Sequence, residues 1–67
     1  MTDTQIIDAI TTRRKELKLT QEELALRAGL TRQYIGLVEK HQKTPSVKVL
    51  VALCDALGLV VNMEEQS

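Results

Sequence analysis

His41 and Cys54 carry the side chains best suited to acid–base and nucleophilic chemistry in this chain. They are thirteen residues apart, with His41 in a polar segment and Cys54 in an apolar stretch of helical character. No carboxylate pair and no glycine-rich phosphate loop lies beside them, so we do not expect an enzyme. One His and one Cys give no metal-ligand spacing, and no cofactor is expected. We interpret Cys54 as a core residue and His41 as a solvated loop residue or a neighbour of a bound phosphate.

The charged residues are unevenly distributed along a chain whose formal net charge is zero. All nine basic residues lie between Thr11 and Lys48, together with only four acidic residues, which leaves this segment with a balance of +5. The ends of the chain carry the other five acidic residues. A basic segment of this kind is typical of a surface that faces phosphate groups. A solvated surface of mixed charge is the alternative, and composition alone does not decide between them.

The length and composition predict one small domain. The chain has 67 residues, of which 43% are apolar and 27% charged, as in globular rather than disordered proteins. No apolar run approaches the ~20 residues that span a bilayer, and the single cysteine cannot form an intrachain disulfide. We therefore expect a cytoplasmic protein without membrane contact. A core of this size supplies about 3–5 kcal/mol net, so we expect oligomerisation to add stability.

The spacing of apolar residues predicts a first helix over residues 4–17 and a second helix of about eight residues after Thr20. Thr20 and Glu23 form a capping box, in which each side chain accepts a hydrogen bond from the other residue's backbone amide. Gly29 can adopt the left-handed conformation that ends a helix.

A third helix is predicted to begin at Thr31, two residues after Gly29, and to continue through Lys40. The short turn between the second and third helices predicts that they cross steeply, as in a helix-turn-helix. An ordinary corner in an all-α core would show the same spacing, so this pattern leaves both interpretations open.

A fourth helix is predicted over residues 47–57, where nine of eleven residues are apolar. Pro45 suits its first turn and Gly58 its end. A helix that is apolar around most of its circumference must be covered on several sides. Because so short a chain can hardly do this alone, we expect a subunit interface that includes Leu53 and Leu57.

Residues 59–64 are rich in β-branched side chains with rough alternation, which predicts a strand. No second strand is predicted, and pairing with the same strand of a twofold-related copy would satisfy its backbone groups. A frayed tail or one further helical turn is the alternative. The predicted fold is therefore all-α, a bundle of four or five helices with a C-terminal β-strand paired across a homodimer. The dimerisation residues expected in the tail are Leu59, Val60, Val61, Asn62 and Met63.

Many of these positions together resemble the lambda-repressor-like, Cro-type helix-turn-helix family, the xenobiotic-response-element group. The resemblance covers residues 6–58. The matching residues are Arg14, Leu17, Leu19, Thr20, Gln21, Glu23, Leu24, Ala25, Gly29, Thr31 to Ile35, Glu39, Thr44 to Ser46 and Ala56 to Gly58. The tail resembles that of the HipB-like antitoxins, in which a terminal strand is shared across the dimer. The resemblance implies a DNA-binding region over residues 1–58, with residues 59–67 as the dimerisation tail of the same domain.

The resemblance implies that the third helix enters the major groove of double-stranded DNA with Arg32 and Gln33 at base edges. Arg commonly pairs with guanine and Gln with adenine. Gln21 is implied to contact phosphate and to support the base-contacting side chains. Leu37 either touches a thymine methyl group or fills a partly buried position. The other DNA-binding residues expected are Thr31, Tyr34, Gly36, Lys40 and Lys43, and for Tyr34 packing on the core is the alternative.

The resemblance also implies an internal ion pair between Arg14 and Glu39 that ties the first helix to the third. Two positions depart from the family pattern. His41 stands where the family often has Gly, which predicts a rearranged loop because His adopts the left-handed conformation less readily. Gly36 stands where a small polar residue is usual, which removes one side-chain hydrogen bond and allows the backbone to approach DNA closely.

Taken together, these features predict a homodimeric transcriptional repressor that binds a palindromic operator with half-sites about 34 Å apart. The tail adds the expectation of an antitoxin with a toxin protein as partner. The alternative is a protein-interaction module in which exposed Ile7, Leu26 and a face of the fourth helix hold a toxin or kinase partner and DNA binding is incidental.

Overall fold

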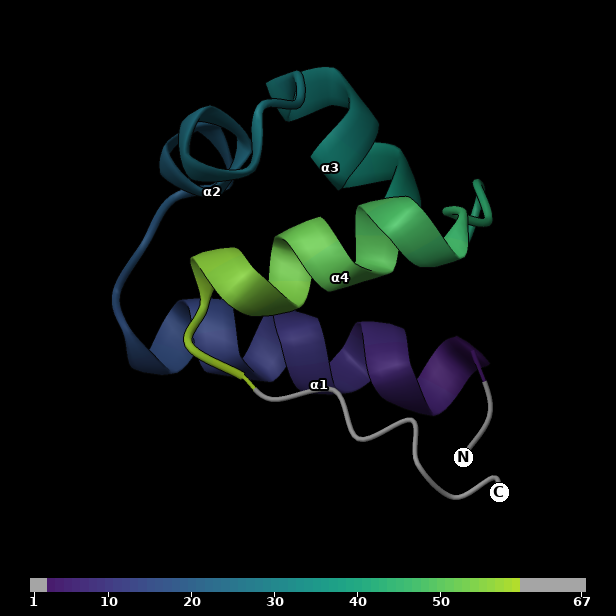
Figure 1. Cartoon of the computed structure of the whole chain (residues 1–67), viewed down its shortest axis with the longest axis horizontal. Coiled ribbons are helices and arrows are strands. Elements are labelled where there is room, and N and C mark those ends of the chain that lie inside the picture. Colours follow the sequence, from purple (N-terminus) through teal and green to yellow (C-terminus); the bar gives the residue numbers. More distant parts are fainter. Residues whose placement is uncertain (1–2, 60–67) are drawn as a thin grey trace.

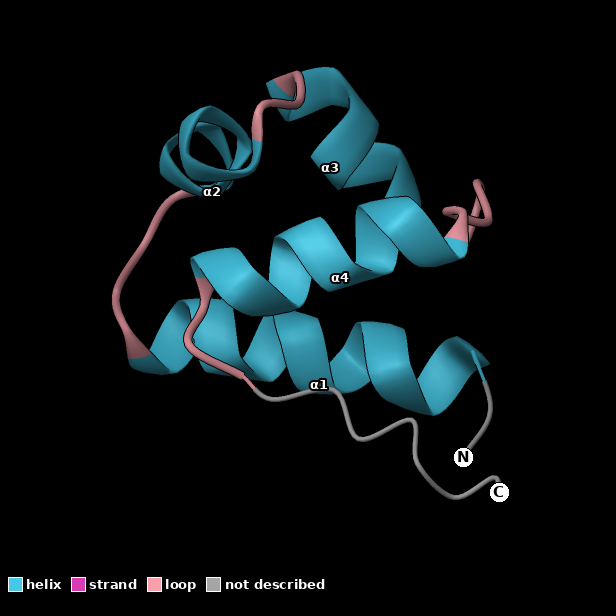
Figure 2. Ribbon diagram, viewed as in Figure 1, coloured by secondary structure: helices cyan, strands magenta, loops and turns pink. Residues whose placement is uncertain are grey.

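The computed structural model describes residues 3–59. These residues form four helices and no strand (Figure 2). The helices are α1 (Asp3–Glu16), α2 (Gln21–Ala28), α3 (Arg32–Glu39) and α4 (Val47–Ala56). Each lies within one residue of its predicted ends, and the all-α prediction is confirmed for this range. The predicted strand is not supported, because Leu59 lies in irregular backbone and residues 60–64 fall outside the described range. The dimerisation residues Val60, Val61, Asn62 and Met63 fall outside it too.

Side-chain caps fix the starts of α2 and α3. The Thr20 hydroxyl accepts a hydrogen bond from the Glu23 amide at 3.0 Å, and the Thr20 amide donates to the Glu23 carboxylate at 2.7 Å. The predicted capping box is therefore confirmed. Thr31 caps α3 in the same way, since its hydroxyl accepts from the Tyr34 amide at 3.1 Å.

Helix α4 begins at Val47 as predicted, but Pro45 does not lie in its first turn. Ser46 is the N-cap, and its hydroxyl accepts a hydrogen bond from the Val49 amide at 3.2 Å. Pro45 precedes this cap and is buried, so it does not lie in the first turn of the helix. The reason is that a hydroxyl at position 46 satisfies a free amide of the first turn, which Pro45 has no means to do.

The turn between α2 and α3 brings the two helices into a steep crossing. Gly29 closes α2 in the left-handed conformation with φ of 74°, and Thr31 begins the next helix two residues later. Figure 1 shows α2 nearly end-on while α3 and α4 run across the view. The predicted helix-turn-helix geometry is confirmed.

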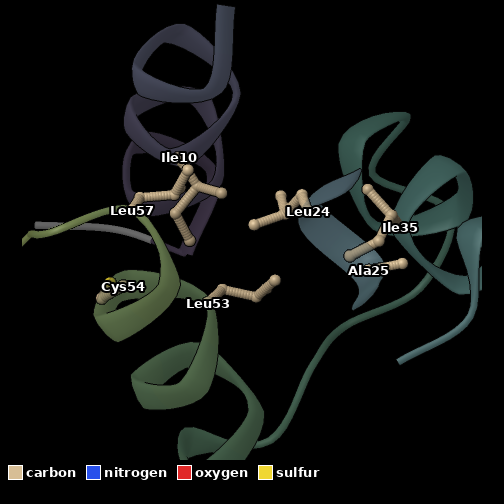
Figure 3. Close-up of a cluster of buried hydrophobic side chains, with 7 residues drawn as sticks. All are labelled: Ile10, Leu24, Ala25, Ile35, Leu53, Cys54 and Leu57. Atoms are coloured by element: carbon tan, nitrogen blue, oxygen red, sulfur yellow. The ribbon is translucent and has the colours of Figure 1, made fainter. Parts of the chain in front are cut away.

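One hydrophobic core receives side chains from all four helices, and Figure 3 shows its central cluster. This cluster consists of Ile10, Leu24, Ala25, Ile35, Leu53, Cys54 and Leu57. Ile7 and Val38 are also buried. Because each of these short helices is marginal alone, their packing on this core is what holds them folded.

Burial corrects the expectation that Leu53 and Leu57 face a second subunit. Both are only 1% exposed within the single chain. The physical reason is that α4 lies at the centre of the fold, where side chains of α1, α2 and α3 join its own side chains in the core. The other apolar residues of α4 are covered less completely, and Val49, Leu50, Val51, Ala52 and Ala56 stay partly exposed. Val47, at the start of α4, is the large apolar residue of this helix that stays open, at 62% exposure.

A buried ion pair connects α1 to α3. The Arg14 Nε atom lies 2.7 Å from Glu39 Oε2, and Arg14 Nη2 lies 3.1 Å from Glu39 Oε1. The third guanidinium nitrogen donates to the Leu19 carbonyl at 2.7 Å. The two charged side chains are 10% and 8% exposed. The predicted internal bridge is confirmed, with the two-point geometry that makes Arg–carboxylate pairs specific.

In the loop after α3, His41 adopts the left-handed backbone conformation that Gly would adopt more readily. His41 has φ of 60°, and its amide donates to the Val38 carbonyl at 3.0 Å. The His41 Nε2 atom lies 3.1 Å from Asp8 Oδ1 on α1. The expected rearrangement therefore does not occur at this residue.

We expect Glu39→Ala to lower the free energy of unfolding by about 3–5 kcal/mol, because it leaves the buried Arg14 charge without a carboxylate. Glu16→Ala is the matched control. Its carboxylate pairs with Arg13 at 3.4 Å on the surface, and such pairs contribute at most about 1 kcal/mol. Urea unfolding followed by circular dichroism measures both variants. Equal, small losses would contradict the structural role given to the buried pair.

We expect the stabilising effect of Glu23 to depend on pH. Hydrogen bonds from Thr20, first from its backbone amide and then from its side chain, lower the pKa of Glu23 below 4.5. A lowered folded-state pKa means that the stabilisation is present above the unfolded-state value and is lost as pH falls through the folded-state value. Wild type should therefore exceed Glu23→Ala in thermal midpoint at pH 7, and the gap should close in acid below pH 4.5. A gap that stays constant down to pH 2 would refute this, and Glu22→Ala, outside the capping box, is the control.

Candidate nucleic-acid interface

Helix α3 presents opposite faces to the core and to the surroundings. Ile35 and Val38, three residues apart, are each 1% exposed and anchor one face in the core. Arg32 and Gln33 precede them in the first turn and are exposed. The exposed Arg32 and Gln33 therefore extend from the start of α3 into the surroundings, while Ile35 and Val38 are buried in the core.

A shallow groove of about 190 Å³ follows this exposed face. We call it the α2–α3 groove. Its lining residues are Gln21, Arg32, Gln33, Gly36, Leu37 and Lys40. Gln21 comes from the first position of α2, and the other five come from α3 and its C-cap. The steep crossing of the two helices thus brings six of the nine residues predicted to bind DNA to one surface.

Gln21 joins this groove to the buried ion pair. Its Nε2 atom donates to Glu39 Oε1 at 2.9 Å. A carboxylate only accepts hydrogen bonds, so the amide of Gln21 must turn its nitrogen toward Glu39. Sequence reasoning missed this contact, because eighteen residues separate the partners and no spacing rule links them. The prediction that Gln21 contacts phosphate and supports the base-contacting side chains stays a prediction, since this bond goes to Glu39.

The electrostatic character of the groove is positive. Arg32 and Lys40 lie along it, and neither forms an ion pair among the described residues. Glu39 is the acidic residue nearest in sequence, but its charge is compensated by Arg14 in the buried pair. Two uncompensated cations beside amide side chains form a surface suited to an anionic ligand with hydrogen-bonding edges.

The other three predicted residues lie outside the groove. The Thr31 hydroxyl oxygen accepts from the Tyr34 amide, which leaves its hydrogen available for donation. Tyr34 is partly buried, and the Lys43 Nζ atom lies 5.7 Å from the centre of its ring. This distance permits a cation–π contact that holds Lys43 close to α3.

Neither of the two residues with catalytic potential lines the groove. Cys54 is 6% exposed, and burial, with a further contribution from Asp55, raises the pKa of its thiol. A thiol held in its neutral form is a poor nucleophile. Within residues 3–59, His, Cys, Asp and Glu nowhere gather in a group of three that could hold a metal ion. The same range contains no helix with the length and apolar character needed to cross a membrane.

Comparisons with known proteins show relatives of one kind. An immunity repressor protein of Bacillus phage phi105 is 45% identical over 62 residues, which are 92% of this chain and 41% of the phage protein. An HTH-type transcriptional regulator of Methanothermobacter thermautotrophicus is 53% identical over 45 residues, 67% of this chain and 65% of the regulator. One from Sinorhizobium fredii is 41% identical over 46 residues, 69% of this chain and 60% of the regulator.

The chain thus spans between about two fifths and two thirds of the length of these relatives. No solved structure gives a significant match. A family model described as helix-turn-helix matches residues 10–60, which include α2, α3 and α4 completely. The chain therefore belongs to the lambda-repressor-like helix-turn-helix family.

Proposed function

We propose that this chain represses transcription by binding a specific sequence of double-stranded DNA through the α2–α3 groove. The observation that carries this proposal is the uncovered polar face of α3, where Arg32 and Gln33 flank a groove that also contains Lys40. Repression, rather than binding alone, is supported by the 45% identity to a protein named as an immunity repressor.

The first turn of α3 enters the major groove in this mechanism. Arg32 can donate two hydrogen bonds to guanine O6 and N7, and Gln33 can pair with adenine N6 and N7. Each such pair discriminates against a wrong base by about 1–3 kcal/mol. Lys40, Lys43 and the Thr31 hydroxyl bind phosphates and fix the register of the helix on the duplex. Bound in this way, the chain occludes the DNA from other proteins.

The active species in our proposal is a homodimer on a palindromic operator with half-sites about 34 Å apart. An α3 of eight residues reaches few bases, so a second copy is needed for a site that is rare in a genome. An antitoxin role with a toxin partner stays a prediction, since it depends on tail residues outside the described range.

The alternative, a protein-interaction module, relied on exposed Ile7, exposed Leu26 and a face of the fourth helix. The structure contradicts the first of these three. Ile7, expected to be exposed, is 3% exposed and belongs to the core. Leu26 does stay open, at 76% exposure, on α2. Because one isolated exposed leucine is common on protein surfaces, we favour the DNA-binding function.

We expect DNA affinity to fall steeply with salt. A dimer that contacts about 6–10 phosphates should lose about 10³–10⁵-fold in affinity between 50 and 200 mM salt. Fluorescence anisotropy with a labelled duplex measures this, using the tightest duplex selected from a randomised pool. A nearly flat salt dependence would contradict the phosphate contacts.

We expect Arg32→Ala and Lys43→Ala to act differently. Arg32→Ala should relax the preference at one base pair and cost about 1–3 kcal/mol on the preferred sequence. Lys43→Ala should weaken all sequences about equally and reduce the salt slope by about one. Lys15→Ala, in the last turn of α1 and away from the groove, is the control. The same loss of base preference in both test variants would show that the assigned roles are wrong.

A further inference from the structure

Gly36 lies in the middle of α3, where the fold itself does not need a glycine. Glycine is among the poorest helix formers, and its use in a helix of eight residues weakens the helix. Its φ angle is not in the left-handed region that favours glycine. A Cβ atom built on Gly36 would meet only Gln21 Oε1, at 3.9 Å, which is an ordinary contact. Neither backbone conformation nor packing within the described residues explains why this position lacks a side chain.

The missing side chain instead opens the floor of the α2–α3 groove. Gly36 lines the groove together with Gln21 and Leu37. Leu37 is 36% exposed and gives the groove an apolar wall. Gln21 cannot swing in to fill the space freely, because its Nε2 atom is bonded to Glu39. The result is a small hollow, apolar on one side, that stays open next to Arg32 and Gln33.

The positive charge beside this hollow restricts the kind of ligand that can occupy it. Arg32 and Lys40 lie along the same groove and favour a ligand that carries negative charge. The apolar wall favours an apolar group on that ligand. In duplex DNA the major groove presents one apolar group, the C5 methyl of thymine.

We propose that Gly36 forms a seat for the methyl group of a thymine, with Leu37 as its wall. This inference rests on the proposed function and adds a base preference that neither Arg32 nor Gln33 supplies. This seat would explain why position 36 is a glycine: the missing side chain lets a base edge approach closely, although glycine lowers the stability of the helix.

The test combines a substitution in the DNA with a substitution in the protein. The DNA is the tightest duplex selected by the wild-type chain from a randomised pool, with each thymine replaced in turn by uracil, which lacks only the methyl group. We expect one thymine position in each half-site to be sensitive. A single uracil at such a position should weaken wild-type binding about three- to fivefold, the value of one buried methyl. Gly36→Leu fills the hollow, so it should bind the thymine duplex about tenfold or more weakly and no longer distinguish thymine from uracil.

A stability measurement separates this effect from misfolding. Gly36→Ala should raise the thermal midpoint by about 4–8 °C, and Gly36→Leu should not lower it, because both residues are better helix formers than glycine. A loss of DNA affinity together with retained or increased stability supports the seat. If uracil is neutral at every position in a duplex that still binds, or if Gly36→Leu keeps the thymine preference, the inference is wrong and the proposed function stands. If the wild-type chain selects no duplex sequence, the proposed function fails and the inference fails with it.

Discussion

The buried contact between Arg14 and Glu39 fixes how three of the four helices meet, and the surface proposed to bind DNA depends on this arrangement. Two charges removed from water are costly unless their hydrogen-bonding groups are satisfied. Here the Glu39 carboxylate accepts from Arg14 and Gln21, and the remaining Arg14 donor group reaches the Leu19 carbonyl. No buried side-chain polar atom among the described residues lacks a hydrogen-bond partner. One carboxylate thereby fixes α1, α2 and α3 relative to one another.

The same contact shapes the surface proposed to bind DNA. Arg14 compensates the negative charge of Glu39, which would otherwise repel phosphate near the α2–α3 groove. Glu39 also orients the Gln21 amide at the edge of that groove. An isolated helix as short as α3 would be largely unfolded in water, so its position depends on Ile35, Val38 and Glu39 together. Its outward residues make no comparable contribution to the fold and are free to serve recognition.

Local signals in the sequence were sufficient to predict most of the helical fold. Thr20 with Glu23 and Thr31 before α3 determine helix starts through hydrogen bonds between near neighbours, and such bonds follow from spacing. The placement of Leu53 and Leu57 did not follow, because apolar periodicity shows that a face is covered but not which chain covers it. Both residues are buried by their own chain.

The candidate site was predictable only in part for a similar reason. The family resemblance supplied Arg32, Gln33, Gln21 and Lys40, and helical phase alone places only Gln33 opposite the buried Ile35. The bond from Gln21 to Glu39 joins residues far apart in sequence, so only the three-dimensional arrangement reveals it. The contact between His41 and Asp8 likewise joins residues 33 positions apart, and no local pattern indicates it.

A titration of the ¹⁵N-labelled chain with its selected duplex, followed by nuclear magnetic resonance, tests the central claim most directly. That claim is that the α2–α3 groove is the surface that meets DNA. We expect the largest changes in backbone amide signals at Gln21, Arg32, Gln33 and Gly36, with small changes along α1. Changes concentrated around Leu26, with the signals of α3 unaltered, would contradict it.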